Sequence, residues 1–177
     1  MMCALMLAAG FGTRLLPLTE RLPKCLVPIN GRPLLDYWLE NLLKDGVEEV
    51  IINTHYLAPL VHQFLNQSSW SSRVTIVHEE RLLGTGGTIL KNRDFFQDEP
   101  FMVVHADNLS IFDASDFISH HIGRPTGTEM TSIVFETSDP HSCGIVELDS
   151  DGIVQDFHEK VANPPGNLAN GAVYILE

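Results

Sequence analysis

The chain has 177 residues, 44% of them hydrophobic, and a formal net charge of -12 at pH 7, a composition typical of a folded globular protein rather than a disordered one. This acidity excludes broad binding to nucleic acid or to anionic membranes, because both need a basic face, and no apolar run approaches the ~20 residues that span a bilayer. We therefore expect a single cytoplasmic domain over residues 1–177, with three separated cysteines that form neither a zinc ribbon nor a disulfide framework.

The first part of the chain alternates apolar runs with amphipathic segments. Residues 3–8 form a continuous apolar run, typical of a strand buried on both faces. Pro33 begins a helix with leucines at helical spacing, and Gly46 fits its end. Further strands are predicted at 47–53, 73–79 and 101–107, with helices after residue 57 and after a glycine turn at 84–87. This order predicts βαβ units and an α/β fold with a mostly parallel sheet.

The pattern changes after Asp107. One more helix is predicted at 113–121, and it is followed by the apolar runs TEMTSIVFE, CGIVELDSDGIVQDFHEK and GAVYILE. Asp151 and Gly152 stand between two apolar runs, which predicts a β-hairpin. The sheet is therefore expected to be mixed, and no repeat or linker divides the chain.

The segment LAAGFGTRLLPLTERLPK, residues 7–24, concentrates glycines and cations in an acidic chain. A glycine turn after a buried strand suits phosphate, because backbone N–H groups approach its oxygens closely. Arg14 can make a forked contact to phosphate, and Lys24 supplies a compact positive charge. A dinucleotide site would need a third glycine where Leu15 stands. Two solvated surface cations are the other alternative, and the glycines and spacing favour a phosphate site.

The longer stretch LAAGFGTRLLPLTERLPKCLVPINGRPLL resembles the opening signature of the sugar-phosphate nucleotidyltransferases, the NDP-sugar pyrophosphorylases. Their pattern is L-A-[AG]-G-x-G-T-R-[LM]-x-P-[LM]-T, then P-K-x-[LM]-[VL]-P. The resemblance continues in order through HEERLLGTGG, VHADN, CGIVELDSDGIV, FHEK and NGAVYIL, so it covers essentially the whole chain. It implies a Rossmann-like three-layer α/β/α nucleotidyltransferase domain. It also implies an enzyme that joins a nucleoside triphosphate to a sugar 1-phosphate and releases pyrophosphate.

The resemblance assigns roles to the residues of this site. In the family an oxygen of the sugar phosphate attacks the α-phosphorus, so catalysis is mostly positioning and charge stabilisation. Arg14 would hold the triphosphate and the departing pyrophosphate, Lys24 would neutralise the α-phosphoryl group, and Asp107 would hold Mg²⁺. An Asx-type turn at a strand end is the alternative for Asp107. The implied nucleotide-binding residues are Leu7, Ala8, Ala9, Gly10, Gly12, Thr13, Glu79, Gly84 and Gly87.

Glu79 bears on the choice of nucleotide. In the family its position lies over the nucleobase, and members that use UTP or dTTP often have Gln there. A carboxylate only accepts hydrogen bonds, and guanine offers two adjacent donors, N1–H and N2–H. The HEE…LGTGG pattern most resembles guanylyltransferases acting on mannose or heptose 1-phosphates. GTP is therefore the predicted substrate, with UTP or dTTP as the alternative, while a solvated surface acid is the structural alternative for Glu79.

Four residues match the sugar-phosphate side of the family, namely Gly144, Glu159, Lys160 and Asn170. By resemblance, the Gly144 backbone and the Glu159 carboxylate would bind sugar hydroxyls, and Lys160 would pair with the sugar phosphate. Because neighbouring residues of a strand point to opposite faces, we expect Glu159 and Lys160 to diverge unless a bulge intervenes. The eight histidines form no HxxxH or HExxH pattern and are predicted to be solvated or hydrogen-bonded.

Family members usually supply a second metal-binding Asp from a later W-x-D-x-G segment, which is absent up to Glu177. We therefore expect a fragment of a longer protein or a shortened member. Two functions stay open, a Mg²⁺-dependent nucleotidyltransferase and a catalytically impaired domain that binds nucleotide or sugar phosphate. An incomplete sheet edge would also favour a homo-oligomer. An NAD-binding oxidoreductase is disfavoured, because Asp36 lies inside a predicted helix rather than where the ribose would need it.

Overall fold

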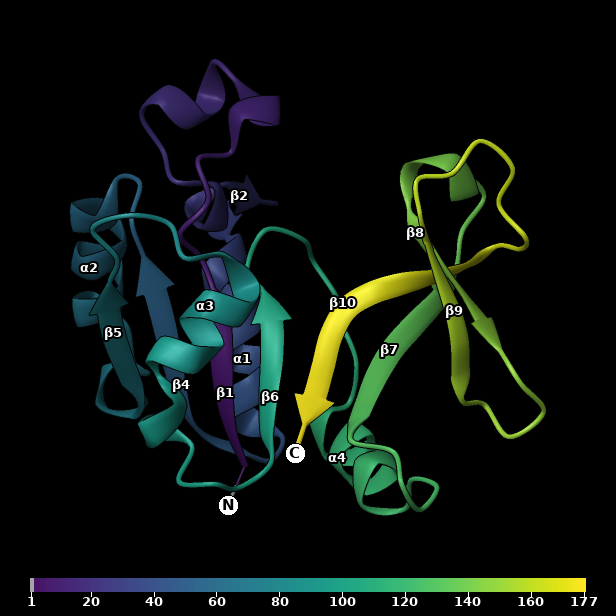
Figure 1. The fold of residues 1–177 in the computed structure, drawn as a ribbon. Helices are drawn as coiled ribbons and strands as arrows, with labels where there is room; N and C mark the ends of the chain where they lie inside the picture. The colour runs from purple at the N-terminus through teal and green to yellow at the C-terminus, as the bar shows by residue number, and fades with distance from the viewer. Residues whose placement is uncertain (1) are drawn as a thin grey trace.

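The computed structural model describes residues 2–177 and shows a mixed eight-stranded sheet with helices on both faces (Figure 1). The strands follow the order β5-β4-β1-β6-β10-β8-β9, and β7 pairs with the free edge of β10. The first four strands of this order are parallel, and β10 runs antiparallel to β6. The strands of the sheet are β1 (Met2–Leu7), β4 (Val47–Thr54), β5 (Val74–His78), β6 (Phe101–His105), β7 (Met130–Glu136), β8 (Gly144–Leu148), β9 (Val154–Glu159) and β10 (Leu168–Leu176).

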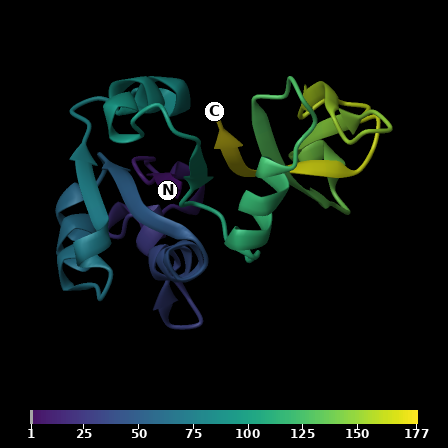
Figure 2. The same ribbon diagram turned by 90° about the horizontal axis from the view of Figure 1, so that it is seen from below.

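Two layers of helices enclose the parallel part of the sheet, as the end-on view in Figure 2 shows. The alternation of β1 residues divides the core: Ala4 and Met6 pack with α1 and α2 on one face, and Leu5 packs on the other face, where Ile89 of α3 lies. The continuous apolar run therefore reflects burial on both sides. The predicted Rossmann-like α/β fold with a mostly parallel mixed sheet is confirmed. The helices are α1 (Leu34–Lys44), α2 (Ala58–Gln67), α3 (Gly84–Lys91) and α4 (Ala114–Ile122).

Several element boundaries differ from the sequence prediction, and three of the differences have a clear structural reason. β6 ends at His105 rather than at Asp107, because the last ladder bond runs from Ala106 N to Leu7 O and the chain then turns. The predicted glycine turn before α3 is shorter than expected: Gly84 has left-handed backbone, φ 71°, whereas Gly86 and Gly87 already belong to the first turn of the helix. Pro33 precedes α1 rather than occupying its first turn, because it belongs to the short ribbon of β2 (Pro28–Ile29) and β3 (Arg32–Pro33).

β10 connects the parallel half of the sheet to the β8–β9 hairpin. Its residues 173–176 pair with β6, whereas Ala169 pairs with Ile145 of β8. A bulge between these two parts, with Ala172 at φ 55°, bends the strand. In consequence the segment after β9 and the segment after β1 rise at the same end of the sheet (Figure 1). None of the helices within residues 2–177 combines the length and apolarity needed to traverse a bilayer.

Candidate active site

A cavity of about 340 Å³ lies where β1, β4 and β6 end. Ligands of open α/β sheets bind at the carboxyl ends of the strands, so the position agrees with the fold. Every nucleotide-binding and catalytic residue predicted from the sequence lines this cavity except Gly87. The lining residues that carry the predictions are Leu7, Ala8, Ala9, Gly10, Gly12, Thr13, Arg14, Lys24, Glu79, Gly84 and Asp107.

The loop after β1 is held in place by the protein itself. Gly12 has φ 67°, and a Cβ there would lie 2.9 Å from Cγ2 of Thr19, so the position requires glycine. The buried Thr19 donates its hydroxyl hydrogen bond to the Gly12 carbonyl over 2.8 Å. Tyr56 in turn donates to the Thr19 carbonyl over 2.9 Å. The glycine-rich turn is therefore preorganised before any ligand arrives.

Lys24 and Asp107 meet at the mouth of the cavity, although 83 residues separate them in the chain. The distance from Lys24 Nζ to Asp107 Oδ2 is 2.7 Å, and the two side chains are 22% and 46% exposed. Such a half-exposed pair stabilises little, so a ligand can replace either partner at small cost. Arg14 is exposed and forms no ion pair among residues 2–177. Within the same residues Asp107 accepts no backbone hydrogen bond, so nothing supports the Asx-turn alternative.

Glu79 is buried, with 1% of its surface exposed, so the surface-acid alternative is wrong. Its Oε1 accepts hydrogen bonds from Thr88 Oγ1 over 2.6 Å and from Asn53 Nδ2 over 3.0 Å. Its Oε2 accepts from the backbone N–H of Leu83 over 3.2 Å. Burial raises the pKa of this carboxyl, but the hydrogen bonds from Thr88, Asn53 and Leu83 outweigh burial and hold the pKa below its ordinary value.

Sequence reasoning missed Asn53, Thr88 and His105, all of which line the cavity. The Asn53 side chain accepts a hydrogen bond from Ala8 N over 2.7 Å and donates one to Glu79. It therefore connects the loop after β1 to the part of the cavity lining that contains Glu79. Asn53 could have been found by the rule that singled out Asp107, since it too follows an apolar strand run. Burial lowers the pKa of His105, the nearby Asp107 carboxylate raises it, and the Lys24 ammonium lowers it, with a net shift below the ordinary value.

Gly87 does not line the cavity. A Cβ at this position would lie 3.0 Å from the Cβ of Leu83, so close packing at the start of α3 accounts for the small residue. Asn170 is engaged within β10: its Oδ1 accepts from Ala172 N over 3.0 Å, and its Nδ2 donates to Tyr174 Oη over 2.6 Å. Asn170 therefore closes the bulge that bends β10.

Gly144, Glu159 and Lys160 lie together on the β8–β9 hairpin but outside the cavity. Gly144 pairs with Glu159 across the two strands, and a Cβ on Gly144 would lie 2.5 Å from Cζ of Phe157. We expected Glu159 and Lys160 to diverge only if both lay on a regular strand, and this condition is not met. Lys160 has left-handed backbone, φ 51°, just after the end of β9, and its Nζ lies 3.1 Å from Glu159 Oε1.

The fold and the cavity together define an α/β protein with a cavity at the carboxyl ends of its parallel strands, the position at which proteins of this class bind ligands. Comparison with known proteins identifies the family within this class. The sequence profile of the family described as Nucleotidyl transferase matches residues 3–177, so the chain belongs to this family. The resemblance on which the sequence interpretation rested is therefore confirmed.

Over the aligned region, about a third of the positions are identical between this chain and its curated relatives. The mannose-1-phosphate guanylyltransferase catalytic subunit beta of Dictyostelium discoideum is 34% identical, covering 99% of this chain and 49% of that protein. Mannose-1-phosphate guanylyltransferase 1 of Arabidopsis thaliana is 33% identical, and the aligned region covers 99% of this chain and 50% of that protein. The chain thus spans about half the length of the curated relatives it matches.

Solved structures agree with the fold. A putative glucose-1-phosphate thymidylyltransferase from Bacillus anthracis, in complex with a sucrose, superposes with a TM-score of 0.88 at 19% identity, covering 100% of this chain and 72% of that one. A UDP-glucose pyrophosphorylase complexed with UDP-glucose superposes with a TM-score of 0.83 at 24% identity, covering 99% of this chain and 76% of that one.

Proposed function

We propose that this chain transfers a nucleoside monophosphate from a triphosphate, with GTP favoured, to mannose 1-phosphate or a similar sugar 1-phosphate such as a heptose. A bond forms between an oxygen of the sugar phosphate and the α-phosphorus. The bond from the α-phosphorus to the bridging oxygen breaks, and pyrophosphate leaves with that oxygen. The observation that carries the proposal is the cavity that gathers Arg14, Lys24 and Asp107 around a glycine-rich loop.

The residues of the cavity act by position and charge. The backbone N–H groups of Gly10 and Gly12, which donate to no atom among residues 2–177, can reach phosphate oxygens because the turn at Gly12 is already fixed. Arg14, free of ion pairs within residues 2–177, would bind the β- and γ-phosphates and then the pyrophosphate. Lys24 would turn from Asp107 to the α-phosphoryl oxygens. The attacking phosphate oxygen is already ionised near neutral pH, so no general base is needed.

The donor set fits a small divalent cation. Mg²⁺ is usually held by one or two carboxylates together with substrate phosphates and water. Asp107 offers a half-exposed carboxylate, and its Oδ2 is bound only by Lys24 among the described residues. Mg²⁺, when bound, would neutralise phosphate charge and polarise the α-phosphoryl group. Asp107 would hold the ion once Lys24 releases its carboxylate.

Similarity to the mannose-1-phosphate guanylyltransferases supports GTP over UTP or dTTP. The Glu79 carboxylate supports it less directly than the sequence pattern implies, since three protein donors already occupy its oxygens. We therefore assign Glu79 to shaping the pocket through Leu83 and Asn53 rather than to reading guanine alone. A UTP- or dTTP-using sugar-1-phosphate nucleotidyltransferase is the alternative substrate choice.

One observation favours a second candidate function, a binding domain without turnover. Among the residues that line the cavity, Asp107 and Glu79 are the only carboxylates, and Glu79 is already hydrogen-bonded on both oxygens. A metal ion would thus have a single protein carboxylate, which weakens its binding. The pocket can bind a triphosphate in either case, because the loop and the cations do not depend on the metal.

Pyrophosphate release tests the proposal. The protein is supplied in turn with GTP, UTP, dTTP and ATP, each with mannose 1-phosphate or glucose 1-phosphate, first with Mg²⁺ and then with chelator. We expect release that needs Mg²⁺ and is fastest with GTP and mannose 1-phosphate. Equal or faster release with UTP would reject the preference for GTP. Nucleotide binding without release would favour the second candidate function.

Replacing Gly10 with Ala separates ligand binding from folding. A Cβ at Gly10 meets no atom within 4 Å and the position is exposed at the cavity, so only a ligand would clash with it. We expect the free energy of unfolding to stay equal or rise by about 0.4–1 kcal/mol. The rise in melting temperature on adding GTP, which reports nucleotide affinity, should become smaller.

Gly166→Ala is the matched control, because Gly166 is also exposed and also has open space around its Cα. This variant should keep the full shift in melting temperature with GTP. A Gly10→Ala protein that binds GTP as tightly as the wild type would show that the phosphates do not lie against this turn.

A further inference from the structure

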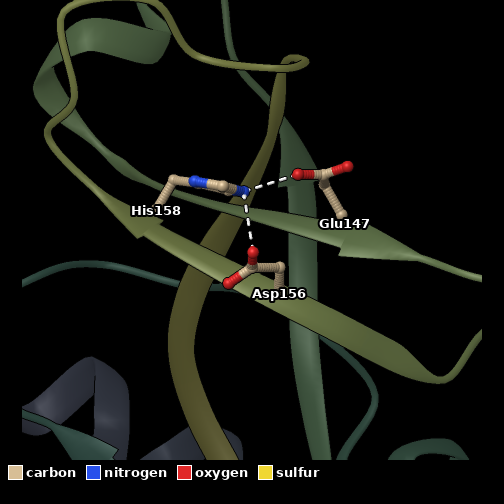
Figure 3. Close-up of side chains that lie close together, drawn as sticks. All are labelled: Glu147, Asp156 and His158. Carbon is tan, nitrogen blue, oxygen red and sulfur yellow. Dashed lines mark hydrogen bonds and ion pairs between the residues drawn. The ribbon is translucent and has the colours of Figure 1, made fainter.

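Three side chains with metal-binding atoms converge on one face of the β8–β9 hairpin (Figure 3). Glu147 lies directly opposite Asp156 in the strand register, and His158 follows Asp156 by two residues, so the pleat places all three on the same side. Nε2 of His158 lies 2.5 Å from Oε1 of Glu147 and 3.8 Å from Oδ2 of Asp156. One donor atom from each side chain lies within 4.8 Å of the other two.

The charges on this face lack a permanent counter-ion. Glu147 and Asp156 are like charges placed opposite each other, an arrangement that destabilises an antiparallel strand pair. Among residues 2–177, no Lys or Arg nitrogen lies within 4.0 Å of either carboxylate. The imidazole of His158 faces both carboxylates through the same nitrogen, and it offers positive charge only while protonated.

We propose that Glu147, Asp156 and His158 form a binding site for a divalent transition-metal ion, with Zn²⁺ as the best fit. Two carboxylates and one imidazole suit Zn²⁺ and Mn²⁺, and an open Zn²⁺ site uses three protein ligands and water. The metal ion takes the place of the proton on Nε2 and neutralises the two carboxylates. Both carboxylates are about half exposed or more, so water can complete the coordination.

This site is separate from the cavity of the proposed function, since none of its three residues lines that cavity. A metal ion here cross-links β8 and β9 next to the pair of Gly144 and Glu159. Mg²⁺ prefers oxygen ligands and its own water shell, so it is expected to bind here much more weakly than Zn²⁺. The proposal does not depend on whether the chain is an active transferase.

Calorimetric titration of metal-free protein with Zn²⁺ tests the site. His158→Gln and Asp156→Asn each remove one ligand, and we expect each to weaken Zn²⁺ binding by more than about tenfold. Asp151→Asn is the matched control, because it makes the same charge change in the turn of the same hairpin. Its exposed side chain forms no hydrogen bond among the described residues, so this variant should bind Zn²⁺ like the wild type.

Paramagnetic broadening by Mn²⁺ locates the ion without any substitution in the hairpin. In ¹H–¹⁵N spectra of the wild type, the amide signals of Glu147 and of residues 156–158 should broaden at low Mn²⁺. The same broadening should persist in Asp107→Asn, which separates this site from the cavity. Broadening confined to the surroundings of residue 107 would overturn the proposal, as would unchanged Zn²⁺ affinity in both hairpin variants.

Discussion

Asp107→Asn is expected to lower Mg²⁺-dependent pyrophosphate release by about 10²-fold or more, because it removes the charge that holds the cation while keeping the shape of the side chain. Asp107 is the single carboxylate at the cavity mouth whose oxygens are not all taken by the protein. Asn is a weaker ligand for a hard cation than a carboxylate. The prediction rests on the proposed transfer reaction, and the rate of pyrophosphate release measures it.

The same substitution should leave nucleotide binding intact in the presence of chelator. Without the carboxylate, Lys24 loses its ion-pair partner and stays available for phosphate, so GTP affinity without Mg²⁺ is expected to equal or exceed that of the wild type. The gain in affinity that Mg²⁺ gives the wild type should disappear. Asp94→Asn is the control, since that side chain is 99% exposed. Wild-type release, or an undiminished Mg²⁺ effect on binding, would show that Asp107 does not hold the metal.

Glu79→Gln is expected to destabilise the protein by about 1 kcal/mol, the lower end of the range for leaving a donor unsatisfied, because the N–H of Leu83 is only partly buried. Glutamine can accept from Thr88 and Asn53 through its oxygen, but its NH₂ group would then face the N–H of Leu83, which the carboxylate now binds. The free energy of unfolding in urea at pH 7 measures the loss. Glu80→Gln, an exposed neighbour with the same change, should have almost no effect.

The effect of Glu79→Gln should shrink in acid. The pKa of Glu79 lies below its ordinary value of 4.5, so the folded protein binds this proton more weakly than the unfolded chain does. The carboxylate therefore contributes its full stability above pH 4.5, and the contribution is lost as the pH falls through the folded pKa. Glutamine does not titrate, so the free energies of unfolding of the wild type and of Glu79→Gln should approach each other as the pH falls. A difference that stays constant down to acid pH would contradict the hydrogen-bonded carboxylate.

Nucleotide selectivity in Glu79→Gln separates its two roles. If Glu79 shapes the pocket, as its hydrogen bonds indicate, the variant should bind GTP and UTP with similar relative losses. If the carboxylate instead hydrogen-bonds to guanine, only the affinity for GTP should fall, while the affinity for UTP stays unchanged or rises. Melting-temperature shifts with each triphosphate measure this ratio, and a selective loss of GTP would restore the direct role that the sequence pattern implies.

Contiguous stretches of sequence were sufficient to predict most of the fold and the glycine-rich loop after β1 that lines the cavity. The run at residues 3–8 predicted a doubly buried strand, and the glycines and cations of residues 7–24 predicted a phosphate site after it. Both are local features, since strand burial follows from continuous apolarity and a glycine turn from its own backbone. The family signature lies in the same local motifs.

Only the tertiary structure decided which side chains share an environment. From the sequence, Glu79 could be either a solvated surface acid or a residue that contacts the nucleobase. In the folded protein it is buried against Asn53 and Thr88, which belong to other elements. The sequence also named Lys24 and Asp107 separately, without their ion pair. The environment of a polar side chain depends on partners that are distant along the chain, and only packing of the strands and helices brings those partners within hydrogen-bonding distance.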